Sequence, residues 1–455
     1  MLNILVSILG IFITIFVVVG VHEFGHFITA RLCGIKILRF SIGFGKALYR
    51  WYDKKGTEYV IAAIPLGGYI KMLDEGEGPV PENELHLAFN RQPFYKKALV
   101  VLAGPAANFI LAIYLYWALF VVGFSTVKPV IGTIAPNSIA AQAGLKPHQE
   151  ILKIDNTPTP SWVSVALHII LRVGDQGTLQ VQTQPFPLTL TNAATNDYSL
   201  SLTHWQLDKL KPDPLESLGI VPYVPAINPV IDFIQPDSPA IHSGLKMGDT
   251  VIAIDKQKIK DWVDVLPIVA KSPGKTLIFT VERQGKKINL PVTVGVKKSF
   301  FVKEHGFLGL GPKIQYQPAL IKLVQYGPLD AIPVALDEVG TFIQLNTILL
   351  GKMITGKVSM QSLGGPITIF ESAGDALNQG IIPFLSFLAF LSISIGFINI
   401  IPIPGLDGGH LLFQTIEFII RRPLSERFQV LCYHLGLIFL FLLIAQAVAN
   451  DIMRL

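Results

Sequence analysis

Four stretches of the chain are apolar and contain no Lys, Arg, Asp or Glu over lengths that can cross a membrane. A helical crossing needs about 20 such residues. The pattern therefore predicts a multi-pass α-helical membrane protein with four transmembrane helices. The stretches cover residues 1–21, 98–127, 376–406 and 428–450.

The first apolar stretch is expected to remain as a helix rather than to be cleaved as a signal peptide. Its start, Met1-Leu2-Asn3, carries no basic side chain, and no small-x-small cleavage site precedes Arg31. The apolar run is also longer than the core of a signal peptide.

The basic residues concentrate between the first and second apolar stretches and after the third. Cytoplasmic loops carry an excess of Lys and Arg, whereas large domains cross largely regardless of charge. Both loops are therefore predicted to be cytoplasmic, with both termini and the long insert outside. The basic residues are Arg31, Lys36, Arg39, Lys46, Arg50, Lys54, Lys55, Lys71, Arg91, Lys96 and Lys97 in the first loop, and Arg421, Arg422 and Arg427 in the other.

Composition agrees with a membrane protein and excludes several other classes. Apolar residues make up 51% of the chain and charged residues 15%, whereas soluble domains are about one quarter charged. The net charge of +5 comes with no long basic tract, so nucleic acid is not an expected partner. Cys33 and Cys432 are expected to be unpaired, and two cysteines exclude a zinc site built on several thiolates.

The outside insert contains a duplication. Residues 131–162 and 231–262 align at a constant offset, which pairs Gly144 with Gly244, Asp155 with Asp255 and Trp162 with Trp262. A pattern that recurs at a fixed period indicates one folding module present twice.

Each copy resembles a PDZ domain, so two tandem α+β PDZ domains are expected. Such modules add an extended peptide to a sheet edge. The second copy has the Gly248-Asp249 pair that is usual in such modules, whereas the first departs from this pattern with His148-Gln149. Plain spacers, or a steric filter against bulky ectodomains, are the alternatives.

Residues 22–26 read His-Glu-Phe-Gly-His at the end of the first apolar stretch. Histidines four residues apart share one face of a helix. Both imidazoles can then bind one zinc ion, with Glu23 as general base on water. The alternative is a pair of core histidines, but ionisable groups within a span are rare and usually functional.

A catalytic zinc takes three protein ligands and keeps one position open. The third apolar stretch runs inward and ends at the depth of His22, where it offers Asp407 and His410. Asp407 is favoured because the preceding prolines and glycines direct irregular backbone toward it, and His410 stays a competitor. Broken helices at membrane depth are tolerated where they line a cavity.

These motifs together resemble the site-2 protease family of intramembrane zinc metalloproteases, over nearly the whole chain. The matching segments are His22–His26, the Asn-x-x-Pro-x-Pro-x-Leu-Asp-Gly pattern at 399–408, Gly43-Phe44-Gly45, Phe89-Asn90, residues 103–108 and the tandem insert.

The resemblance implies that His22, His26 and Asp407 bind one zinc ion and that Glu23 is the catalytic base. It implies hydrolysis of peptide bonds within or next to the transmembrane segments of single-span proteins in a bacterial inner membrane. The implied substrates are a truncated anti-sigma factor and remnant signal peptides, and the other implied partners are the lipid bilayer and PDZ peptide ligands. The substrate-binding residues would be Gly43, Phe44, Gly45, Asn399, Pro402 and Pro404.

The first cytoplasmic loop is expected to supply a membrane-associated β-sheet that holds the unwound substrate. Residues 35–45 and 57–72 form it, and Pro65 with Gly67-Gly68 should end its second strand. Asn399 would bond the exposed substrate backbone, although a helix–helix contact is the alternative.

Residues 316–375 contain amphipathic stretches at 320–326 and 343–350. They are predicted to be helices on the outer membrane surface, acting as a gate or as a brace.

The predicted division follows from these assignments. It consists of 1–30 (first span), 31–97 (cytoplasmic loop), 98–124 (second span), 125–220 and 221–315 (PDZ domains), 316–375 (surface region), 376–406 (third span), 407–427 (cytoplasmic loop) and 428–450 (fourth span).

Three other functions fit part of the pattern: a membrane zinc transporter or sensor, a PDZ scaffold with an inactive metal site, and a protease for soluble misfolded proteins. A chelator-controlled assay with a single-span substrate separates the first two from an intramembrane protease, and cleavage-site mapping separates the third.

Overall fold

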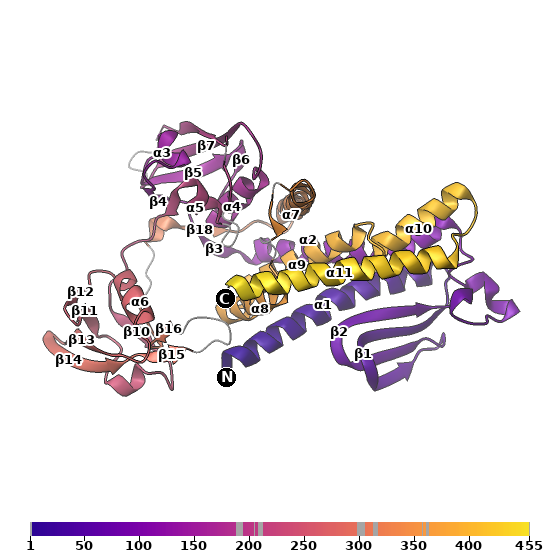
Figure 1. The fold of residues 1–455 in the computed structure, drawn as a ribbon, viewed down its shortest axis with the longest axis horizontal. Helices are drawn as coiled ribbons and strands as arrows, with labels where there is room; N and C mark the ends of the chain where they lie inside the picture. Colours follow the sequence, from indigo (N-terminus) through magenta and orange to yellow (C-terminus); the bar gives the residue numbers. More distant parts are fainter. Residues whose placement is uncertain are drawn as a thin grey trace.

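Four long apolar helices form the body of the protein (Figure 1). The structure, a computed structural model, describes residues 2–454 except 188–193, 204, 208–212, 298–304, 313–316, 357 and 361–363. The predicted multi-pass helical architecture is therefore confirmed. The helices are α1 (Leu2–Leu32), α2 (Phe94–Val122), α9 (Ile381–Ile400) and α11 (Glu426–Arg454).

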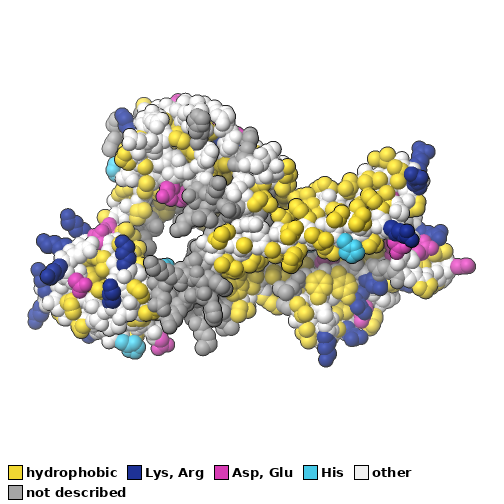
Figure 2. All heavy atoms as spheres, in the orientation of Figure 1, with side chains coloured by type: hydrophobic (Ala, Val, Ile, Leu, Met, Phe, Trp, Pro, Cys, Tyr) yellow, Lys and Arg dark blue, Asp and Glu magenta, His cyan; other side chains and the backbone are white. Residues whose placement is uncertain are grey.

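α2 lies at the centre of the bundle and α11 at its margin. In the most apolar part of each helix, 39% of α2 is buried inside the protein, but only 6% of α11. Val18 of α1, Leu115 of α2 and Leu388 of α9 meet in one buried cluster. Large apolar side chains such as Leu435 and Phe441 are exposed, and apolar side chains cover much of the helical body (Figure 2). An apolar surface of this extent suits a lipid environment.

Two predicted span boundaries are wrong because a helix ends or begins inside each apolar stretch, where the hydropathy does not change. The stretch 376–406 is divided by Gly380 (φ 120°), which separates α8 (Pro366–Gln379) from α9. The tail of the stretch 98–127 leaves the helix at Gly123 (φ 82°) and becomes strand β3 (Phe124–Val127). Positive φ values of this kind suit glycine and end helices.

The region after the third span also differs from the prediction. The predicted loop 407–427 begins with a helix, α10 (Asp407–Ile420), and Pro402 and Pro404 lie in the link between α9 and α10. Proline has no amide hydrogen to continue a helix, so α9 ends just before them.

The first loop folds into the predicted sheet, formed by β1 (Ile37–Tyr52) and β2 (Glu58–Met72). The expectation that Pro65 and the glycines end the second strand is wrong, since β2 continues to Met72. Both strands bend, so that β1 residues have partners on two sides: Phe40 faces Ile70 on one and Tyr59 on the other. The sheet lies beside the C-terminal part of α1 (Figure 1). Two 3₁₀ turns follow, Glu75–Glu77 and Glu82–Leu87.

The long insert forms two α/β units whose four-stranded sheets have corresponding strand orders, β6-β5-β7-β8 and β12-β11-β13-β14. Each unit has its own buried core. Their identity as PDZ domains stays a prediction. The first unit contains β4 (Ile131–Ile134), α3 (Ile139–Gln142), β5 (Gln149–Ile154), β6 (Thr157–Pro158), α4 (Trp162–Leu171), β7 (Thr178–Pro185), β8 (Asn196–Ser201), α5 (Pro214–Leu218) and β9 (Ile220–Pro222). The second contains β10 (Ile231–Ile234), a 3₁₀ turn (Ile241–Ser243), β11 (Thr250–Ile254), β12 (Gln257–Lys258), α6 (Trp262–Ala270), β13 (Thr276–Arg283), β14 (Lys286–Thr293), β15 (Gly295–Lys297), β16 (His305–Phe307) and β17 (Leu310–Pro312).

Asp249 of the second unit, which corresponds to Gln149 of the first, has a structural role. Its buried carboxylate accepts hydrogen bonds from Arg283 Nε at 2.7 Å and from the Lys246 amide at 2.9 Å. Burial alone would raise the pKa of Asp249, but Arg283 and the Lys246 amide lower it below its usual range. In the first unit Gln149 Oε1 accepts the corresponding bond from the Lys146 amide at 3.4 Å. Gln149 therefore makes the same bond to the backbone of the turn as Asp249 does, but without a charge.

The predicted amphipathic region is only partly helical. Residues 343–350 lie within α7 (Ala331–Ile354), but the stretch 320–326 forms β18 (Ile321–Val324), after a 3₁₀ turn at Pro318–Leu320. β18 pairs with β3, which leaves α2 directly. The expected domain boundary at 315–316 falls on residues outside the described part of the chain.

Candidate metal centre

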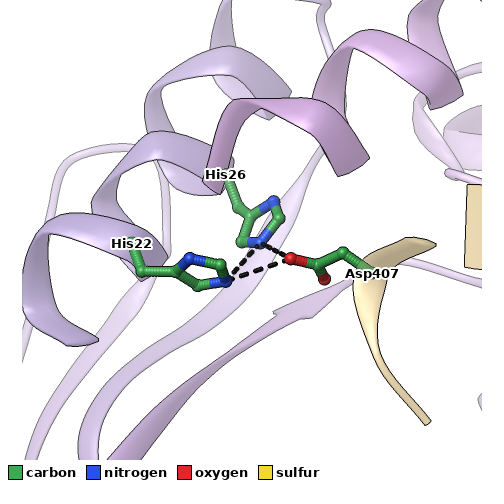
Figure 3. Close-up of side chains that lie close together, drawn as sticks. All are labelled: His22, His26 and Asp407. Carbon is green, nitrogen blue, oxygen red and sulfur yellow. Dashed lines mark hydrogen bonds and ion pairs between the residues drawn. The ribbon is translucent and has the colours of Figure 1, made fainter. Parts of the chain in front are cut away.

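His22 and His26 lie one turn apart on α1 and are both buried. Their Nε2 atoms are 3.2 Å apart, and Figure 3 shows both rings directed at the same point. The Nδ1 of His26 is 2.7 Å from the backbone oxygen of Val100 on α2. An N–H on Nδ1 that donates to this carbonyl fixes the ring and leaves Nε2 as the metal-binding nitrogen.

Asp407 reaches the two histidines from the N-terminus of α10 (Figure 3). Its Oδ2 is 3.1 Å from His22 Nε2 and 3.3 Å from His26 Nε2. Gly408 makes this approach possible, because a Cβ there would lie 2.3 Å from the backbone oxygen of Ile400. The glycine after the aspartate thus allows the tight turn that brings the carboxylate back to α1.

His410, the competing candidate, points elsewhere. Its Nδ1 is 3.0 Å from the hydroxyl of Tyr433 on α11. Among the described residues, the group whose ligand atoms lie close enough to hold a metal ion consists of His22, His26 and Asp407.

This donor set fits a zinc ion. Zinc bonds of about 2.0–2.2 Å in a tetrahedron place ligand atoms about 3.3–3.5 Å apart, close to the separations of 3.1, 3.2 and 3.3 Å found here. Asp407 Oδ2 is buried, and no hydrogen bond satisfies it among the described residues, although both Nε2 atoms lie 3.1–3.3 Å away. A cation between these three atoms would bind all of them. Three protein ligands leave the fourth position open, as in catalytic zinc sites.

Glu23 lies between the two histidines in sequence and is partly exposed. It is within electrostatic range of both imidazoles and of Asp407. Gly68 of β2 packs against it, since a Cβ at Gly68 would lie 2.9 Å from Glu23 Cγ. The sheet therefore contacts the predicted base, which the sequence did not reveal.

The other predicted site residues lie in two groups near this centre. Gly43 and Gly45 have φ values of 93° and 84°, and the ring of Phe44 stacks on that of Tyr69 with centroids 6.1 Å apart. Gly43 follows Ile42, whose register partner is Gly68. The second group occupies the last turn of α9 and the link to Asp407, and consists of Asn399, Pro402 and Pro404.

Gly104 on α2 packs directly against the ring of His26. A Cβ at this position would lie 2.3 Å from Nε2 of His26. Gly25 allows the same close approach of α1 to α2, because its Cβ would lie 2.4 Å from the backbone oxygen of Ala103. Small residues at such positions let membrane helices pack closely, and the run 103–107 is the sequence signal for this contact.

We expect Gly104→Ala to displace the His26 ring and to weaken zinc binding about 10–100-fold. This is the usual cost of changing a residue that holds a metal ligand in place. Competition with a chelator of known affinity measures this loss. Gly20→Ala on α1 is the matched control, because nothing lies within 4 Å of a Cβ there. Equal zinc affinity in the two variants would contradict the assignment.

Comparison with known proteins extends over the whole chain. A model of peptidase family M50 matches residues 10–443. The regulator of sigma-E protease RseP of Escherichia coli (strain K12) is 44% identical over 456 residues, 100% of both chains. The protease RseP of Yersinia pestis is 42% identical over 456 residues, again 100% of both chains. A putative zinc metalloprotease of Vibrio cholerae is 38% identical over 456 residues at the same coverage.

Proposed function

The chain belongs to peptidase family M50, and from this premise we propose that it cuts single-span membrane proteins within or beside their transmembrane segments. It is a zinc metalloprotease of the site-2 type. One observation carries the proposal: two imidazoles and a carboxylate converge within a bundle of apolar helices. A peptide bond that reaches this point must come from a substrate that enters the membrane region.

In the proposed mechanism, His22, His26 and Asp407 hold one zinc ion. When bound, zinc supplies a Lewis acid that polarises the scissile carbonyl and makes water more acidic. Glu23 takes the proton of the attacking water and passes it to the leaving amine. The carboxylate suits this role because it adjoins the metal ligands in sequence and in space.

The sheet supplies the means to hold an unwound substrate. A transmembrane helix must open before its amides can be attacked, and freed backbone groups in lipid need hydrogen-bond partners. The segment 68–70 of β2 pairs with β1 on one side, and no other described strand pairs with its outer edge. Gly68 of this segment adjoins Glu23. A substrate added as a strand at this edge would present its backbone to the site.

Gly43→Ala and Asn399→Ala are expected to slow cleavage by up to about 100-fold, the effect of a small misplacement of a substrate at the reacting atoms. Gly43 has φ 93°, and its Cβ would lie 2.9 Å from the Ile64 oxygen, so alanine would distort the sheet. Both variants should keep their zinc, as metal analysis can verify. Gly340→Ala on α7, where nothing lies within 4 Å of a Cβ, is the control. Loss of zinc from both test variants would refute a substrate-binding role.

The decisive test of the activity uses the purified full chain and a single-span test protein. We expect chelator-sensitive cleavage, with mass spectrometry placing the cut within or next to the apolar segment. Cuts confined to soluble unfolded proteins would overturn the proposal in favour of surface proteolysis.

The arrangement of the elements supports an orientation in a bacterial inner membrane. Both termini and the two α/β units lie toward one end of the helical body, and the β1–β2 sheet lies toward the other (Figure 1). With the basic loops in the cytoplasm, the termini and the α/β units would be periplasmic and the metal centre would lie near the inner leaflet.

The name of the Escherichia coli relative, regulator of sigma-E protease RseP, supports a role in sigma-E regulation for this chain as well. We infer a truncated anti-sigma factor as one substrate and remnant signal peptides as others. The α/β units, as PDZ domains, would bind peptide ends or exclude bulky ectodomains.

A further inference from the structure

Asn108 of α2 is buried behind His22 and has an unusual hydrogen-bond pattern. Its side chain is fully buried, and its Nδ2 lies 3.3 Å from Nδ1 of His22. Its Oδ1 is buried without a hydrogen-bond partner among the described residues. A buried amide oxygen without a partner is costly, so this residue needs an explanation.

The requirements of a metal-binding histidine decide which end of the Asn108 amide faces His22. If Nε2 of His22 binds a cation as a neutral imidazole, Nδ1 carries the hydrogen and needs an acceptor. The oxygen and nitrogen of an asparagine amide exchange places when the group turns by 180°, and they are assigned from the hydrogen-bond network. With the amide turned, Oδ1 accepts the Nδ1–H bond of His22, and Nδ2 takes the position that has no hydrogen-bond partner among the described residues.

From these contacts we infer that Asn108 is a positioning residue: its amide oxygen accepts the hydrogen bond from Nδ1 of His22 and holds Nε2 toward the metal. This inference rests on the proposed zinc chemistry. His26 has the same arrangement, with the Val100 carbonyl as its acceptor at 2.7 Å. α2 therefore orients both imidazoles of α1, one through a side chain and one through the backbone.

The surroundings of Asn108 keep it in place and link it to α9. The Ser392 hydroxyl donates to the backbone oxygen of Asn108 at 2.8 Å. A Cβ at Gly396 would lie 3.2 Å from that of Asn108, so α9 approaches α2 closely at this turn. α9 leads through its short link to Asp407. One turn of α2 thus contacts a metal-binding histidine and the helix that leads to the carboxylate.

The test compares two variants. Asn108→Leu removes the hydrogen-bond acceptor for His22, whereas in Asn108→Asp both ends of the side chain are acceptor oxygens. We expect Asn108→Leu to weaken zinc binding about 10–100-fold, the usual effect of removing the partner of a metal-binding histidine. Asn108→Asp should bind zinc as tightly as the unmodified chain or more tightly. Affinity is measured on the purified full chain by competition with a zinc chelator. Thr14→Val is the control, since it removes a buried hydroxyl of α1 that bonds only within its own helix, to the Gly10 oxygen.

Two outcomes would overturn the inference: undiminished zinc affinity in Asn108→Leu, or an equal loss in Asn108→Asp. If Asn108→Leu does not fold, the affinity of Asn108→Asp decides by itself. Asp407→Ala, measured in parallel, separates this inference from the proposed function. Zinc binding that does not depend on Asp407 would refute the metal centre, whereas loss of zinc in that variant alone would refute only the role of Asn108.

Discussion

Glu23→Gln is expected to retain zinc and to lower the rate of peptide-bond cleavage by about 10²–10⁴-fold, the range that general-base catalysis contributes. Glutamine has the shape of glutamate but cannot take a proton from water. The substitution leaves His22 and His26 unchanged, and they are joined to Val100 and Asp407 by contacts that do not involve Glu23. Binding and catalysis should therefore separate in this variant.

Single-turnover cleavage of a single-span substrate, together with metal analysis of the same preparation, measures both effects of Glu23→Gln. Glu371→Gln is the matched control, because Glu371 is an exposed carboxylate on α8. Cleavage by Glu23→Gln at the unmodified rate would remove Glu23 from the mechanism.

Asp407→Ala should lose zinc and reduce cleavage to background. Removing a residue that only holds a metal ligand in place costs about 10–100-fold in metal affinity. Removal of the ligand itself should therefore cost more. In the structure Asp407 Oδ2 is the atom that joins the two Nε2 atoms, at 3.1 and 3.3 Å. Its loss would leave two histidines on one helix, too few ligands for a catalytic zinc site.

His410→Ala is the informative comparison for Asp407→Ala. It removes the other candidate ligand, only three residues along the chain, whose ring bonds to Tyr433 instead. We expect this variant to keep its zinc, as measured by metal analysis after dialysis. The opposite pattern, with zinc lost from His410→Ala and kept by Asp407→Ala, would mean that the ligand is His410.

The helical body could be predicted from the sequence because its cause is local. A long apolar stretch forms a helix in a membrane whatever its neighbours are, since every backbone group must be satisfied internally. The four spans were found for this reason, and the pairing of His22 with His26 follows from helix periodicity alone. The errors fall where backbone conformation, not hydropathy, ends a helix, as at Gly123 and Gly380.

Strand pairing between distant segments was harder to predict. The stretch 320–326 is amphipathic enough to suggest a helix, yet it forms β18 because β3, at the end of α2, lies beside it. The continuation of β2 past Gly68 likewise depends on the bend that gives Phe40 two partners. Both outcomes are decided by contacts that no local pattern contains.

The membrane-spanning class, the histidine pair with its intervening glutamate, and two candidates for the third ligand could all be read from the sequence. That Asp407 and not His410 meets the histidines depends on how the link after α9 turns at Gly408, which no sequence pattern indicates. Only the structure revealed Gly68, Gly104 and Asn108 as neighbours of the site. The physical reason is common to all of these: periodicity arranges side chains along one helix, whereas convergence on one ion requires several elements packed at fixed distances.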